Sequence, residues 1–123
     1  MADRFHWAGH LPDPAVAYSA ADALLHPTVY DTFGLVVAEA MAYGLPVVVS
    51  RAAGISDLIK HGISGWVLEK GTAEETALAL GALAREATLC ERLGDGARAV
   101  AARRTWDDVA ADTMAVYRSV TGE

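Results

Sequence analysis

The first half of the chain alternates short apolar runs with segments of helical period. Unbroken or β-branched apolar runs indicate buried strands, and apolar residues repeating every three or four positions indicate helices. This pattern predicts strands at 4–8, 23–26, 47–50 and 66–68, with helices at 14–21, 35–43 and 55–60. Strands alternating with helices are typical of a parallel sheet with crossover helices. We therefore expect an α/β fold with a Rossmann-like open parallel sheet and flanking helices.

The second half of the chain carries only helical patterns. Thr72 and Glu75 have the spacing of a capping box, and apolar residues recur at helical spacing as far as Leu89. Gly94 and Gly96 predict a break in the next segment.

A last helix is expected to begin at Thr105. Its buried side would consist of Trp106, Val109, Met114 and Tyr117. The whole chain is thus predicted to be a single domain, with a sheet core at 1–70 and a helical tail at 71–123.

Composition narrows the classes of function. The 123 residues suffice for one buried core, and the net charge of −6 with scattered Lys and Arg argues against nucleic-acid binding. Cys90 is the only cysteine, so its expected role is helix packing. Glu39, Gly44 and Pro46 interrupt the longest apolar stretch, so a membrane span is not expected. A signal peptide is not expected before this stretch either. A cytoplasmic location fits, either free or peripheral to a membrane through parts outside this sequence.

Glu39 stands alone as a charged residue in this apolar stretch. An ionised carboxylate in a helix built for burial is costly unless polar groups meet it. The helix is expected to begin near Gly34 and to end at Tyr43, because Gly44 fits a left-handed cap and Pro46 cannot continue the helix. Glu39 is therefore predicted to be buried against a polar partner or ligand. The alternative is a glutamate turned to solvent.

Asp31 lies eight residues before Glu39, at the expected helix start. The positive end of the helix dipole favours a negative charge there, or the phosphates and hydroxyls of a ligand. Eight helical residues span roughly 12 Å, which is too far for both carboxylates to act on one bond. They can instead hold opposite ends of an elongated ligand. In open α/β sheets ligands bind beyond the carboxyl ends of the strands, so the site is expected between the loops 26–34 and 50–57.

The segment HPTVYDTFGLVVAEAMAYGLPVVVSRAAGISDLI resembles the donor-binding segment of retaining glycosyltransferases with the two-domain GT-B fold, especially family 4. That family has a Glu, seven residues and a second Glu in a frame of Pro-Ser, Phe-Gly, Glu-Ala and Gly-Leu-Pro-Val. Asp31 and Glu39 occupy the two acidic positions. The frame is met by Pro27, Phe33, Gly34, Ala40, Gly44, Leu45, Pro46 and Val47, and the family's strand-turn ending by Gly62, Ile63, Ser64, Gly65 and Trp66.

The resemblance implies a role for each matching residue. Asp31 would contact hydroxyls of the donor sugar, and Glu39 would hold the ribose hydroxyls of the nucleotide. Backbone amides at the helix start would meet the sugar and the diphosphate. The implied donor-binding residues are Thr32, Phe33, Gly34, Leu35 and Gly54. The implied substrate is a nucleotide-diphosphate sugar, and the resemblance implies neither a cofactor nor a metal.

The sequence departs from the family pattern at several positions. Asp31 is one methylene shorter than the usual Glu, so sugar contacts must be closer or bridged by water. The family pattern also has a later Gly-Gly-x-x-Glu, in which Ala53 and Gly54 here replace the Gly pair and Asp57 replaces the Glu. The family's acceptor domain, and the units that supply Arg and Lys to the diphosphate, have no counterpart here. We therefore expect an incomplete C-terminal half of a GT-B fold that binds a nucleotide sugar for retaining transfer and is inactive alone. Its expected partner is an acceptor-binding domain or chain.

Two other functions stay open. The chain can be a non-catalytic nucleotide-sugar-binding or regulatory subunit that docks on a partner or self-associates, or an enzyme resembling a nucleotide-sugar epimerase, which needs further acid–base residues. His26, at a strand end, is interpreted as a packed or capping residue. Arg51 either approaches a phosphate or is solvated.

Overall fold

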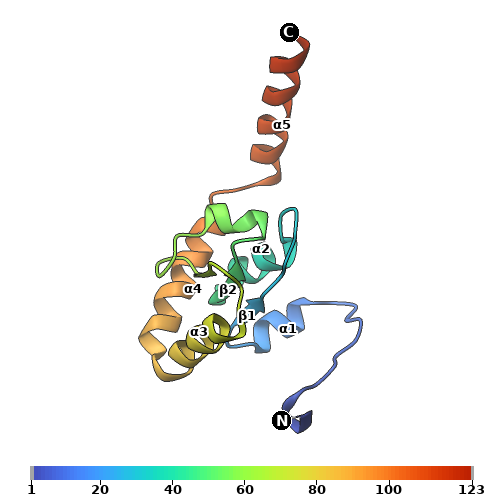
Figure 1. The fold of residues 1–123 in the computed structure, drawn as a ribbon. Coiled ribbons are helices and arrows are strands. Elements are labelled where there is room, and N and C mark those ends of the chain that lie inside the picture. The colour runs from blue at the N-terminus through green and yellow to red at the C-terminus, as the bar shows by residue number, and fades with distance from the viewer. Residues whose placement is uncertain (1, 123) are drawn as a thin grey trace.

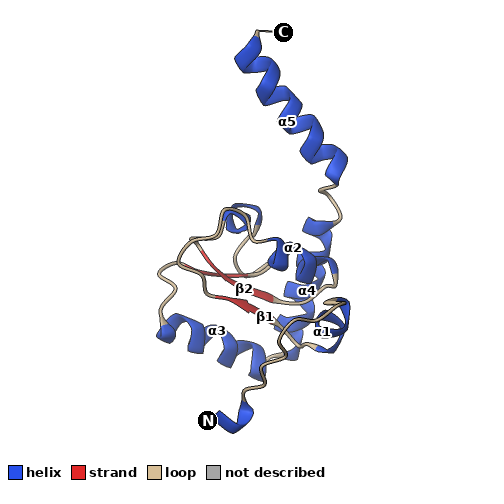
Figure 2. Ribbon diagram, turned by 90° about the vertical axis from the view of Figure 1, so that its right-hand side faces the viewer, coloured by secondary structure: helices blue, strands red, loops and turns tan. Residues whose placement is uncertain are grey.

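The computed structural model describes residues 2–122. The body of the protein is a three-stranded parallel sheet (Figures 1 and 2). The strands β1 (Leu24–His26), β2 (Val47–Ser50) and β3 (Trp66–Leu68) lie in the order β1-β2-β3. Leu24 lies opposite Val47, and Val48 lies opposite Trp66. The predicted open parallel α/β sheet is confirmed, and the carboxyl ends of all three strands share one edge.

Helices connect and follow the strands. In chain order they are the 3-10 helix η1 (Ala2–Arg4), α1 (Ala15–Ala20), α2 (Leu35–Ala42), the 3-10 helix η2 (Gly54–Leu58), α3 (Ala73–Arg85), α4 (Ala87–Ala101) and α5 (Trp106–Thr121). The α2 helix begins at Leu35 as predicted and ends at Ala42, one residue before the predicted end, with Gly34 and Tyr43 as its caps. The described helices include none that is long and apolar enough to cross a membrane.

Both faces of the sheet are covered, which explains the unbroken apolar run of β2. All four residues of β2 are buried. Val47 and Val49 face a core that includes Met41 of α2, whereas Val48 faces a second core with Leu83 of α3 and Leu93 of α4. The α4 helix contributes to both cores and so ties the two helical layers together.

Two glycines of the helical half do not interrupt their helix. Gly94 and Gly96 lie inside α4, so the predicted break there is wrong. A Cβ on Gly94 would meet the carbonyl oxygen of Gly44, and one on Gly96 that of Ile63, at distances under 3.0 Å. The two glycines let α4 press against these loops. The helix break comes earlier instead, at Glu86, so the helical pattern that extends to Leu89 spans two helices.

The predicted first strand does not form. Residues 5–10 have no strand pairing, and Phe5 and Trp7 are 71% and 93% exposed. A strand needs a neighbour for its backbone groups, and none of the described segments offers one. This part of the chain extends away from the body (Figure 1).

The last helix also departs from expectation. The α5 helix projects from the body and has no buried residue (Figures 1 and 2). Trp106 and Tyr117, predicted to be buried, are 76% and 60% exposed. A capping box between Thr105 and Asp108 starts the helix. The predicted buried side of α5 is therefore wrong, because the residues of this helix are exposed apart from Val109, which is half-buried.

Candidate functional site

The loops that follow β1 and β2 are hydrogen-bonded to each other at the carboxyl edge of the sheet. The Asp31 amide donates to the Ala52 carbonyl (3.3 Å), and the Gly54 amide donates to the Asp31 carbonyl (3.1 Å). The Ile55 amide donates to the Phe33 carbonyl (2.7 Å). The predicted closeness of the two loops is confirmed, and the pairing fixes Asp31 relative to the sheet.

Gly54 is required by this loop pairing. A Cβ at this position would lie less than 3.0 Å from the Thr32 carbonyl oxygen. Its amide already donates to Asp31. The structure therefore gives Gly54 a place in the loop scaffold, and contacts of Thr32 and Gly54 with a donor stay predictions.

Both carboxylate oxygens of Asp31 have partners in the protein. Oδ2 pairs with His26 Nε2 at 2.9 Å, and Oδ1 accepts the Phe33 amide over 3.1 Å. The Asp31 side chain is 28% exposed, so it still reaches solvent. Sequence reasoning interpreted His26 as a packed or capping residue and did not find its pairing with Asp31. The Phe33 amide, expected at the donor, is directed at Asp31 instead.

The start of α2 offers unsatisfied backbone donors next to Asp31. Gly34 precedes the helix with a φ of 99°, a left-handed conformation that favours glycine. Among residues 2–122, no side chain caps this end and no group accepts a hydrogen bond from the amides of Gly34 and Leu35. Free N–H groups at the positive end of a helix dipole bind anions.

Glu39 is exposed, so the predicted burial of this carboxylate is wrong. The α2 helix turns Val37, Ala40 and Met41 towards the body and leaves Glu39 on its outer side. The alternative of a solvent-facing glutamate is correct. Its predicted need for a polar partner is nevertheless met, because the Tyr18 hydroxyl donates to Glu39 Oε2 over 2.7 Å.

Tyr18, which sequence reasoning missed, comes from α1. Its ring is buried and lies 5.4 Å from the ring of Tyr43, centroid to centroid. Burial, and then the hydrogen bond to Glu39, raise the pKa of Tyr18 to about 12. The available signal was the lone glutamate itself, which called for a donor on a neighbouring element.

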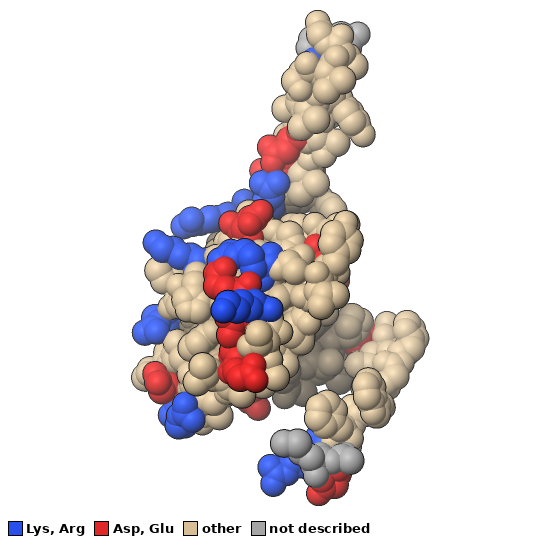
Figure 3. Space-filling view, viewed as in Figure 1, with Lys and Arg blue, Asp and Glu red and all other residues tan. Residues whose placement is uncertain are grey.

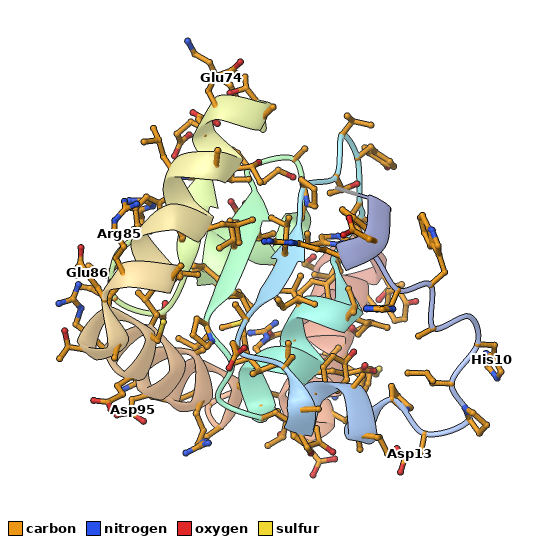
Figure 4. The ribbon with its side chains drawn as sticks, turned by 90° about the horizontal axis from the view of Figure 1, so that it is seen from below. His10, Asp13, Glu74, Arg85, Glu86 and Asp95 are labelled. Carbon is orange, nitrogen blue, oxygen red and sulfur yellow. The ribbon has the colours of Figure 1, made fainter. Side chains whose placement is uncertain are left out.

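A shallow hollow of about 260 Å³ lies between the start of α1 and the outer side of α2. It is lined by Asp13, Pro14, Ala15, Tyr18, Glu39, Ala42 and Tyr43. Figure 4 labels Asp13 beside α1, whereas Glu74, Arg85, Glu86 and Asp95 point outward from the α3 and α4 side.

A second hollow, of about 200 Å³, lies beyond the ends of β2 and β3. It is lined by Thr28, Val29, Ser50, Arg51, Ala52, Glu69, Lys70 and Gly71. Arg51 forms a two-nitrogen ion pair with Glu69, which raises the pKa of Arg51 and lowers that of Glu69. Arg51 is thus engaged by a carboxylate. Acidic and basic side chains are mixed on the face shown in Figure 3.

Comparison with known proteins gives the family. The family model for Glycosyl transferases group 1 matches residues 1–100 of this chain. The protein therefore belongs to the group 1 glycosyltransferases, as the motif around Asp31 and Glu39 predicted.

The individual similarities agree with this family. The chain is 35% identical over 106 residues to a D-inositol 3-phosphate glycosyltransferase of Streptomyces griseus, covering 86% of this chain and 22% of that protein. Sucrose-phosphate synthase from Thermosynechococcus elongatus superposes with a TM-score of 0.75 at 29% identity, covering 89% of this chain and 28% of that one. Anabaena HepE has been solved with UDP, with UDP and glucose, and with UDP-glucose. It superposes with a TM-score of 0.70 at 26% identity, covering 87% of this chain and 29% of HepE.

The position within the fold follows from these matches. The C-terminal domain of a group 1 glycosyltransferase from Francisella tularensis shares the fold, with a TM-score of 0.72 at 21% identity, covering 78% of this chain and 51% of that one. The chain spans about a quarter of the length of the curated relatives it matches. It corresponds to part of the C-terminal half of a GT-B glycosyltransferase, as expected.

Proposed function

We propose that this chain binds the nucleotide-diphosphate sugar donor of a retaining glycosyltransferase. The observation that carries the proposal is the row formed by Asp31, the unbonded amides of Gly34 and Leu35, and Glu39, which follows the first turns of α2. Its length suits an elongated, doubly charged ligand. The UDP and UDP-glucose found in Anabaena HepE support this ligand class.

Glu39 would anchor the ribose. Its Oε2 accepts the Tyr18 hydroxyl, and no described group occupies Oε1. A carboxylate oxygen accepts two hydrogen bonds, so neighbouring ribose hydroxyls find acceptors on both oxygens. Charge-assisted hydrogen bonds of this kind are the strong ones.

The diphosphate would lie against the start of α2. There the amides of Gly34 and Leu35 and the helix dipole offset its negative charge without a metal ion. During transfer the same groups would stabilise the leaving diphosphate, together with cationic residues from outside this chain. Arg51 is held by Glu69, so it is not assigned to this task.

Asp31 would position the sugar through the lone pairs that His26 and the Phe33 amide leave free. Retention would follow from attack by the acceptor on the face of the sugar that the diphosphate leaves. The acceptor would be held by a separate domain or partner chain, so the isolated chain is expected to bind a donor without transferring its sugar.

Calorimetric titration with UDP and UDP-glucose tests these roles. Glu39→Ala should strongly weaken the binding of both while leaving it measurable, whereas Asp31→Ala should weaken the binding of UDP-glucose more than that of UDP. Glu91→Ala, which removes another exposed helix glutamate, is the matched control and should bind both like the parent. Parent-like binding of both nucleotides by the Glu39 and Asp31 variants would refute the assignment.

A further inference from the structure

We propose that Tyr18 is a positioning residue that holds the Glu39 carboxylate in one orientation and thereby selects ligands with a free pair of ribose hydroxyls. This inference rests on the proposed function, because it concerns how Glu39 meets a nucleotide. The Tyr18 hydroxyl donates to Glu39 Oε2 over 2.7 Å and connects α1 with α2.

Tyr18 is well suited to fix another side chain. The residue is 9% exposed and belongs to the same core as Val37 and Met41 of α2. The ring also packs at a tilt of 34° on Tyr43, which follows α2. The hydroxyl is therefore anchored to the element that carries Glu39.

Glu39 needs such a restraint. Its side chain is exposed, and a glutamate that loses its free rotation on binding costs conformational entropy. The bond to Tyr18 removes part of that freedom before a ligand arrives. The carboxylate keeps Oε1 and one lone pair of Oε2, which is enough to accept two adjacent hydroxyls.

The hydrogen bond between Tyr18 and Glu39 has two possible roles, orienting the Glu39 carboxylate or only joining α1 to α2, and the two roles predict different binding data. A bond that only joins α1 to α2 affects stability, and it affects the binding of every nucleotide equally. A bond that orients Glu39 affects only the ligands whose ribose hydroxyls contact Glu39. The ribose hydroxyls are therefore the variable that distinguishes the two roles.

The experiment is a calorimetric cycle with UDP and its 2′,3′-dideoxy analogue. It uses the parent chain, Tyr18→Phe, Glu39→Ala and the double variant. Tyr117→Phe is the control, because it removes an exposed hydroxyl from α5. Tyr18→Phe should weaken the binding of UDP roughly two- to tenfold, which corresponds to the entropy cost of immobilising one side chain. The same variant should leave the dideoxy analogue unchanged and add no further loss to Glu39→Ala.

Three results would overturn the proposal: an equal loss for both nucleotides, an unchanged affinity for UDP in Tyr18→Phe, or a further loss in the Glu39→Ala background. A parent that binds no nucleotide would refute the proposed function of this chain. Titration of the Tyr18 phenol by ¹³C NMR would then still test the bond, without a Tyr18 variant. The pKa should lie near 12 in the parent and lower in Glu39→Ala; equal values would contradict the restraint.

Discussion

Replacing Gly54 by alanine tests the loop pairing on which the site depends. The added Cβ would lie less than 3.0 Å from the Thr32 carbonyl oxygen, 3.1 Å from the Thr32 carbonyl carbon and 3.3 Å from the Phe33 Cα. All three are backbone atoms, so no flexible side chain can move aside. The loop after β2 must therefore shift away from the loop after β1.

The cost follows from what that shift disturbs. Two backbone hydrogen bonds flank the new methyl group: the Gly54 amide donates to the Asp31 carbonyl (3.1 Å), and the Ile55 amide donates to the Phe33 carbonyl (2.7 Å). Each such bond contributes a net of about 0.5–1.5 kcal/mol, and overpacking a tight contact costs about 1–3 kcal/mol. We expect Gly54→Ala to lower the free energy of unfolding by about 2–4 kcal/mol.

Urea denaturation followed by circular dichroism measures this change. Gly81→Ala, inside α3, is the matched control, because the atoms nearest to its Cβ would belong to the flexible end of the Arg85 side chain. An alanine there should stabilise the protein by up to about 1 kcal/mol, the difference in helix propensity. A Gly54→Ala variant that unfolds at the parent's urea concentration, or a shift of both variants in the same direction, would contradict the close contact at Gly54.

Three further outcomes are expected. Gly96→Ala should destabilise the protein by at least about 2 kcal/mol in urea denaturation, because its Cβ would meet the Ile63 carbonyl; a parent-like midpoint would contradict the close approach of α4. Removal of residues 105–123 should leave the urea midpoint unchanged, since α5 buries nothing, and a lower midpoint would show a hidden contact. The raised pKa of Tyr18 keeps this phenol protonated in the folded chain while the unfolded chain ionises near 10. Stability should therefore fall as the pH rises from about 10 towards 12, more in the parent than in Tyr18→Phe; equal slopes in urea titrations would refute this.

The elements that depend on local chemistry could be predicted from the sequence. The β-branched run Val47–Ser50 requires cover on both faces, and the structure provides it. Gly34 and Tyr43 mark the ends of α2 because turn conformations are encoded locally. Gly94 and Gly96 were predicted as helix breakers because helix propensity does not show that they allow close contact between α4 and the loops at Gly44 and Ile63.

The burial of segments that would pack on residues far away in the sequence could not be predicted from local patterns. The pattern at 4–8 and in α5 describes sides suited to packing, but no described residue covers them. In the site, motif spacing selected Asp31 and Glu39. The partners of Asp31, His26 and the Phe33 amide, lie five and two residues away, whereas the partner of Glu39 comes from another helix. Glu39 meets Tyr18 across 21 residues of sequence. The exposure of Glu39 likewise depends on which side of α2 faces the body.

Amide chemical-shift mapping during titration of the chain with UDP-glucose addresses the proposed site directly. Saturable shifts should concentrate at Gly34, Leu35 and Glu39, with little change along α3 and α5, and the same titration with GDP-glucose and ADP-glucose would show which base is preferred. Saturable shifts confined to the hollow around Arg51 and Lys70, or a folded chain that binds none of these nucleotide sugars, would contradict a donor site at the start of α2.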